Sequence, residues 1–152
     1  MKTIIILLFT SSILLAQENK YILHEPQSQT SDFKILSSCG ITGIDSEEFK
    51  YFRELIFNKN YSEISNNLKS TNVLNRVISV IVLEELTNQK LFTPSKDEIN
   101  AITVIKTLNN YYHLCSGCTT QSSGTVSSIF YSDASSSGSI DIIRLIKNKV
   151  GF

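Results

Sequence analysis

Tryptophan is absent from this chain of 152 residues, and glycine and proline are scarce, with six and two residues. No charge of either sign dominates, because 14 basic residues balance 14 acidic ones. Proteins that bind nucleic acid or anionic membranes usually carry a basic excess, so we expect neither partner. Beyond the N-terminal segment, no apolar run approaches the roughly 20 residues of a membrane-spanning helix.

Known catalytic motifs are also missing. The chain contains no His-Glu-x-x-His, no glycine-rich phosphate loop and no Gly-x-Ser-x-Gly. A catalytic serine needs a histidine base, and the chain has only His24 and His113. These absences favour a protein that is not an enzyme, and we expect no cofactor and no catalytic residue.

Residues 1–16 have the order of a secretory signal peptide. Lys2 supplies a positive start, an apolar stretch follows, and the small residue Ala16 precedes the polar run that begins at Gln17. We expect cleavage after Ala16, export to the periplasm or the medium, and no membrane insertion of the mature chain. Residues 17–43, with Pro26 and a polar run, predict an extended lead-in.

Apolar residues recur at helical spacing through residues 44–115, which predicts a helical core. The predicted helices cover 45–58, 61–68, 73–89 and 94–114. The segment 73–89 is apolar on nearly every side, so it is expected to be the central, buried helix. The helix over 94–114 is expected to start with the cap Thr93 and with Pro94 at its first position. Cys115 then continues its inward stripe.

Residues 116–138 are rich in serine and glycine and predict a loop with room for a short hairpin through 125–126 and 129–131. A last helix is expected over 139–152, with Ser139 as its cap and its apolar face packed on the core. The predicted fold class is therefore all-α, a small stack of about five helices.

The middle of the chain resembles a HEAT-type helical repeat. In that pattern a short helix ends at a polar corner, and a longer helix follows with an arginine near its start. The residues that carry the resemblance are Leu68, Asn72, Arg76, Val80, Leu83 and Leu86. The resemblance implies a HEAT-like stack of helix pairs.

A looser resemblance covers roughly residues 60–119. This stretch is similar to uncharacterised exported bacterial proteins in which a helix pair is followed by a Cys-Ser-Gly-Cys-Thr segment, here Cys115 to Thr119. The resemblance implies a helical fold and a cell-envelope setting, and it implies no activity.

The three cysteines, Cys39, Cys115 and Cys118, are the sharpest chemical feature of the chain. Exported proteins meet an oxidising compartment, so a structural disulfide is the favoured interpretation. Cys39 pairs with Cys115 or Cys118, or the latter two pair with each other, and one thiol is left over.

Two other chemistries use the same cysteines. Cys115 and Cys118 form a Cys-x-x-Cys, the arrangement of thiol–disulfide redox proteins, although a helix C-terminus disfavours the reactive thiolate. Cys39, His113, Cys115 and Cys118 together form a Cys3His set, which zinc accepts in tetrahedral geometry.

The sequence favours a non-enzymatic binding or structural module of a bacterial envelope with an unknown protein partner. The redox protein is the alternative, and a zinc-stabilised module is the third hypothesis.

Overall fold

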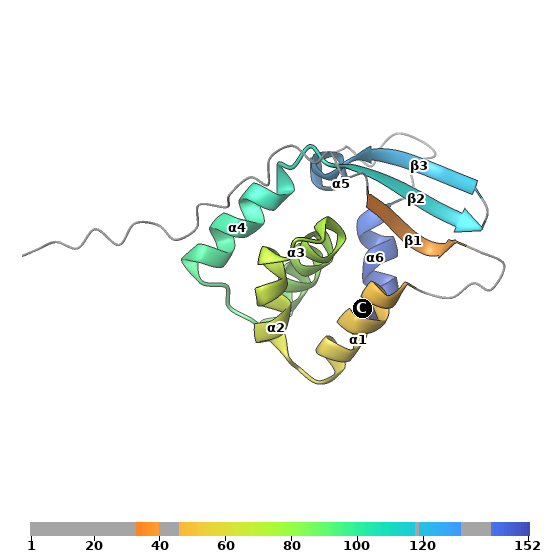
Figure 1. The fold of residues 1–152 in the computed structure, drawn as a ribbon. Helices are drawn as coiled ribbons and strands as arrows, with labels where there is room; N and C mark the ends of the chain where they lie inside the picture. Colours follow the sequence, from red (N-terminus) through yellow and green to blue (C-terminus); the bar gives the residue numbers. More distant parts are fainter. Residues whose placement is uncertain (1–32, 40–45, 118, 132–140) are drawn as a thin grey trace, which may run out of the picture.

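The fold combines helices with one small sheet (Figure 1). The computed structural model describes residues 33–39, 46–117, 119–131 and 141–152. The elements are β1 (Phe33–Cys39), α1 (Glu47–Phe57), α2 (Tyr61–Asn66), the 3-10 helix η1 (Asn67–Lys69), α3 (Val73–Asn88), α4 (Lys96–Lys106), β2 (Tyr111–Gly117), β3 (Thr119–Thr125), α5 (Val126–Tyr131) and α6 (Ile142–Val150). The predicted helical character is confirmed for the described part of the chain. The all-α class is only approximately right, since it omits the sheet.

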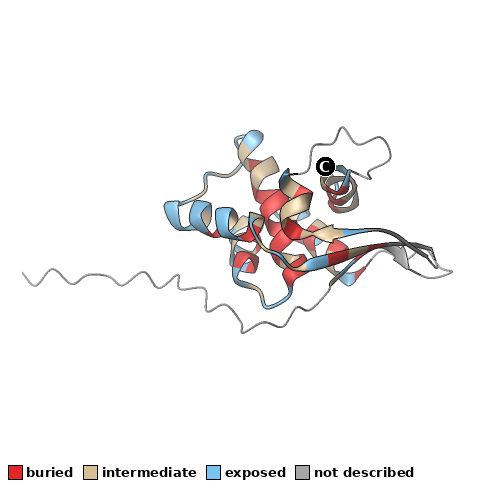
Figure 2. Cartoon of the chain, turned by 90° about the horizontal axis from the view of Figure 1, so that it is seen from above, coloured by how far each residue is buried: buried red, intermediate tan, exposed pale blue. Residues whose placement is uncertain are grey.

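The helix α3 forms the centre of the core. Asn72 caps it, because its Oδ1 accepts hydrogen bonds from the backbone N–H groups of Leu74 (2.9 Å) and Asn75 (3.4 Å). Its apolar side chains are buried on almost every side, and Figure 2 shows the buried residues concentrated in the middle of the molecule. The predicted central helix over 73–89 is confirmed.

The helix α4 starts and ends elsewhere than predicted. Its cap is Ser95, not Thr93, and Ser95 forms a reciprocal capping box with Glu98. Glu98 also accepts a short hydrogen bond from Ser65 of α2, which fixes the start of α4 against that helix. Burial acts to raise the pKa of Glu98, but the hydrogen bonds from Ser65 and Ser95 outweigh it, and the pKa is lowered overall. The helix ends at Lys106, so the predicted helix over 94–114 is wrong beyond that residue.

The sheet has the strand order β1-β2-β3, with β1 parallel to β2 and β2 antiparallel to β3. Residues 33–39, predicted to belong to an extended lead-in, form the edge strand β1. Residues 111–114, predicted to be helical, belong to β2. Tyr112 and Leu114 point into the core, whereas Tyr111 is half exposed, which is the alternation of a strand with one buried face.

The serine-rich segment also contains regular structure. The prediction of a loop over 116–138 is wrong for β3 and α5, and the predicted hairpin through 125–126 and 129–131 is replaced by the helix α5. A different hairpin is present, formed by the antiparallel strands β2 and β3. Gly124 lets β3 pass close to its neighbours, because a Cβ there would lie 2.7 Å from Ser128 Oγ and 3.0 Å from the Tyr112 ring.

The C-terminal helix α6 packs against α1 and α3. Asp141 caps it by accepting a hydrogen bond from the Arg144 N–H at 2.9 Å, and Gly151 ends it in the left-handed conformation with φ of 100°. The predicted cap Ser139 and the predicted signal peptide over 1–16 lie outside the described residues.

Candidate functional site

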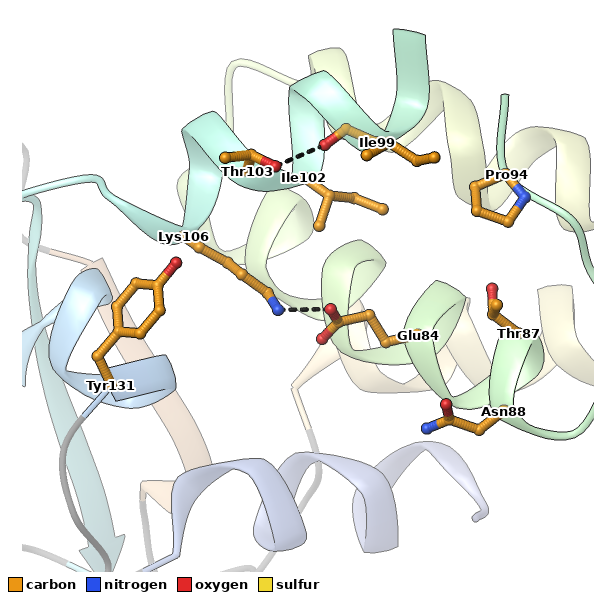
Figure 3. A pocket seen from close by; sticks show the side chains of 9 residues that line it. All are labelled: Glu84, Thr87, Asn88, Pro94, Ile99, Ile102, Thr103, Lys106 and Tyr131. Carbon is orange, nitrogen blue, oxygen red and sulfur yellow. Dashed lines mark hydrogen bonds and ion pairs between the residues drawn. The ribbon is translucent and has the colours of Figure 1, made fainter. Parts of the chain in front are cut away.

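A groove runs between the C-terminal half of α3, the exposed helix α4 and the end of α5 (Figure 3). Its volume is about 530 Å³, which lies within the range of ligand-binding pockets. Its lining residues are Glu84, Thr87, Asn88, Pro94, Ile99, Ile102, Thr103, Lys106 and Tyr131. The groove thus collects apolar, hydrogen-bonding and charged groups from three elements.

The folding of α4 against α3 creates the groove. Only Ala101 and Ile105 of α4 are buried in the core. Ile102, which is partly buried against the core, and the exposed Ile99 line the groove together with Pro94 (Figure 3). Ile99 is 50% exposed, so this apolar wall is open to solvent.

The charged groups of the groove are paired with each other. Glu84 of α3 and Lys106 of α4 form an ion pair through a short hydrogen bond that crosses between the helices (Figure 3). The ammonium of Lys106 also lies 5.3 Å from the centre of the Phe130 ring, within the range of a cation–π interaction. The pair leaves the groove without net charge.

The uncharged polar groups differ in how far their hydrogen bonds are already used. The Thr87 hydroxyl donates to the Leu83 carbonyl at 2.7 Å, and the Thr103 hydroxyl donates to the Ile99 carbonyl at 2.9 Å. Asn88 makes no side-chain hydrogen bond to any described residue. Its carboxamide therefore keeps both donor and acceptor capacity for a ligand.

Tyr131 forms the end of the groove at α5. Its side chain is 62% exposed and points toward the Lys106 end of the groove (Figure 3). Exposed tyrosines with an apolar ring and a polar tip are frequent anchors at protein interfaces. The chemistry of the groove therefore suits non-covalent binding.

The expected site residues that the structure describes, Cys39, His113 and Cys115, lie elsewhere, on the sheet. The backbone register places His113 between Lys34 and Ser123, and Cys115 between Leu36 and Thr120. Cys115 lies in the strand β2, so its predicted position at the C-terminal end of a helix is wrong.

The other two cysteines are only partly placed. Cys39 lies opposite Gly117 in the register of β1 and β2, and Cys118 lies outside the described residues. Within the described ranges, no three His, Cys, Asp or Glu side chains are grouped to hold a metal ion. The proposed Cys3His set, which includes Cys118, stays a prediction.

The sequence interpretation missed the groove entirely. One signal was present: Ile99 does not fit the inward stripe of its helix, so it marks an apolar position outside the core-facing side.

No helix in the described part of the chain is both long and apolar enough to cross a membrane. No family model matches the chain, and no significant similarity was found to a curated protein or to a solved structure.

Proposed function

We propose that this chain is a non-enzymatic binding or structural module of a bacterial cell envelope, and that it contacts a protein partner through the groove between α3, α4 and α5. The observation that carries the proposal is the apolar exposure at this groove. Ile99 of α4 and Tyr131 of α5 are at least half exposed and come from separate elements to line one depression.

Exposed apolar side chains are informative when they converge. Single ones are common on any protein surface, whereas neighbouring ones beside a depression mark interaction sites. Phe57, at the end of α1, is 86% exposed but does not line the groove. Phe57 therefore serves as a matched control, because it is an exposed apolar side chain that lies outside the groove.

The envelope setting and the helix arrangement complete the proposal. The signal-peptide pattern of residues 1–16 supports export. The HEAT-type resemblance carried by residues 68–86 supports a binding module, because stacked helix pairs of this kind bind partners on their exposed faces. Redox exchange and zinc binding both require Cys118, which lies outside the described residues, so they stay alternative hypotheses.

Site-specific photo-crosslinking in the native host tests the proposal. A photoreactive amino acid is placed at position 99 or, in the control, at position 57. We expect a discrete adduct from position 99 in the envelope fraction, containing one protein identified by mass spectrometry. The adduct is expected to disappear when Tyr131→Asp disrupts the end of the groove. Equal adducts from both positions, or none from position 99, would refute the proposed surface.

A further inference from the structure

We propose that the occupant of the groove is a short, extended and uncharged peptide segment of the partner. One apolar side chain of this segment lies against Pro94, Ile99 and Ile102, and one of its backbone peptide units pairs with the Asn88 carboxamide. This inference rests on the proposed function, and it specifies the chemistry by which the same groove recognises its partner.

Charge balance argues for a neutral occupant. Glu84 and Lys106 satisfy each other, and their side chains are 42% and 22% exposed. Because attraction to one member of the pair and repulsion from the other largely cancel, an acidic or a basic segment would lose its hydration without gaining an ion pair, unless it broke this one. Breaking a partly buried pair leaves the other charge desolvated without a partner, which opposes binding. A neutral segment encounters neither cost.

The short apolar wall of the groove argues for an extended segment. Its aliphatic lining residues are Pro94, Ile99 and Ile102, which together offer room for one apolar anchor. Helix-in-groove recognition instead uses anchors spread over at least two turns. An extended peptide needs only one apolar anchor and a few backbone contacts to fill the same space.

The hydrogen-bonding groups argue for recognition of the backbone. A peptide unit offers one N–H donor and one C=O acceptor, and a carboxamide offers the complementary pair in one plane. Thr87 and Thr103 have already donated their hydroxyl protons to their own helices. Among the lining residues, Asn88 is therefore the group best suited to bind a peptide unit through two hydrogen bonds.

Titration of the isotope-labelled exported chain with blocked peptides tests the inference. The probes are acetylated and amidated hexapeptides of serine and threonine with one central Val, Ile, Leu or Phe. Two-dimensional NMR is expected to show shifts at the Asn88 side-chain amide and at the backbone of Ile99 and Thr103. Replacing the central apolar residue by Asp or Lys, or methylating its backbone nitrogen, is expected to weaken binding about tenfold.

Variants of the protein provide the second readout. Asn88→Leu is expected to weaken the best probe about tenfold, whereas Asn58→Leu, an exposed asparagine after α1, leaves affinity unchanged. The inference is wrong if all four apolar probes leave the groove signals unmoved, if a charged probe binds more tightly, or if dilution alone moves these signals, which would show a second copy in the groove. If these tests fail while crosslinking from position 99 succeeds, the proposed function stands and only the occupant is wrong.

Discussion

At the scale of single residues, the first two turns of α3 contain polar atoms that the core does not satisfy. Arg76 is only 8% exposed, and its Nε has no hydrogen-bond partner among the described residues. Asn75 Oδ1 and the Oγ of the fully buried Ser79 are also unpaired there. Burial lowers the pKa of Arg76, because it disfavours the charged guanidinium. Desolvating a charged group and leaving one of its donors unpaired costs free energy.

We therefore predict that Arg76→Met stabilises the protein. Methionine fills a similar elongated space without a charge to desolvate, so the free energy of unfolding is expected to rise by about 1 kcal/mol. Urea denaturation monitored by circular dichroism measures this change. Arg144→Met, at an exposed position of α6, is the control and is expected to change stability by less than about 0.5 kcal/mol. A loss of stability in the Arg76 variant would contradict the prediction.

At the scale of elements, an ion pair joins α6 to α3 in addition to the apolar packing between the two helices. Lys147 Nζ lies 2.5 Å from Glu85 Oε2, and the Glu85 side chain is only 19% exposed. The hydrogen bond from Lys147, followed by that from Gln89, lowers the pKa of Glu85. The ionised carboxylate therefore contributes to holding the last helix in place.

The contribution of Glu85 is expected to depend on pH. Its folded pKa is below the unfolded value of about 4.3, so the stabilisation is complete above about pH 5 and is lost as the pH falls through the folded pKa. Glu85→Gln is expected to lower the free energy of unfolding by about 0.5–1 kcal/mol at pH 7. The difference from wild type should shrink toward zero in urea titrations between pH 5 and pH 3. A difference that stays constant over this range, or that Glu54→Gln reproduces, would show that the pair does not stabilise the fold.

Local patterns identified the helices well and the strands poorly. The apolar run of α3 has only one satisfactory location, the centre of the core, and its position was predicted correctly. In contrast, Ala101, Ile105 and Tyr112 fit a helical stripe, although the helix ends at Lys106 and Tyr112 belongs to a strand. The pairing of β1 with β2 joins residues about 80 positions apart, as in Phe33 with Tyr112, and no local period reports such a contact.

At the scale of the whole molecule, the groove could not be predicted because it exists only in the folded chain. Its walls come from the C-terminal half of α3, from the segment 94–106 and from Tyr131. Each contribution alone resembles an ordinary helix surface. The ion pair of Glu84 and Lys106 likewise joins residues 22 positions apart. Local sequence patterns predicted most of the helices, whereas the groove depends on how the helices pack together. Export stays a prediction.

The fold also limits which cysteines can be bridged. Cys39 lies opposite Gly117, so it is offset from Cys115 by two positions along the neighbouring strand. One strand spacing combined with two residue steps separates their α-carbons by about 8 Å. Disulfides rarely join α-carbons more than about 7 Å apart. A bridge between Cys39 and Cys115 would therefore require the two strands to shift.

We accordingly predict that any single disulfide in this protein includes Cys118. Mass spectrometry after denaturation and alkylation without reductant is expected to show one labelled thiol in the wild-type chain and two in Cys118→Ser. The same spectrum tests the predicted cleavage, which would make Gln17 the first residue. Cys39→Ser then separates the remaining pairings, because it leaves no free thiol if Cys115 bridges Cys118 and two if Cys39 does. A Cys118→Ser chain that takes up no label would mean that Cys39 and Cys115 are joined despite the register. Three labelled thiols in the wild type, with a zinc mass in the native spectrum, would replace the disulfide by a metal site.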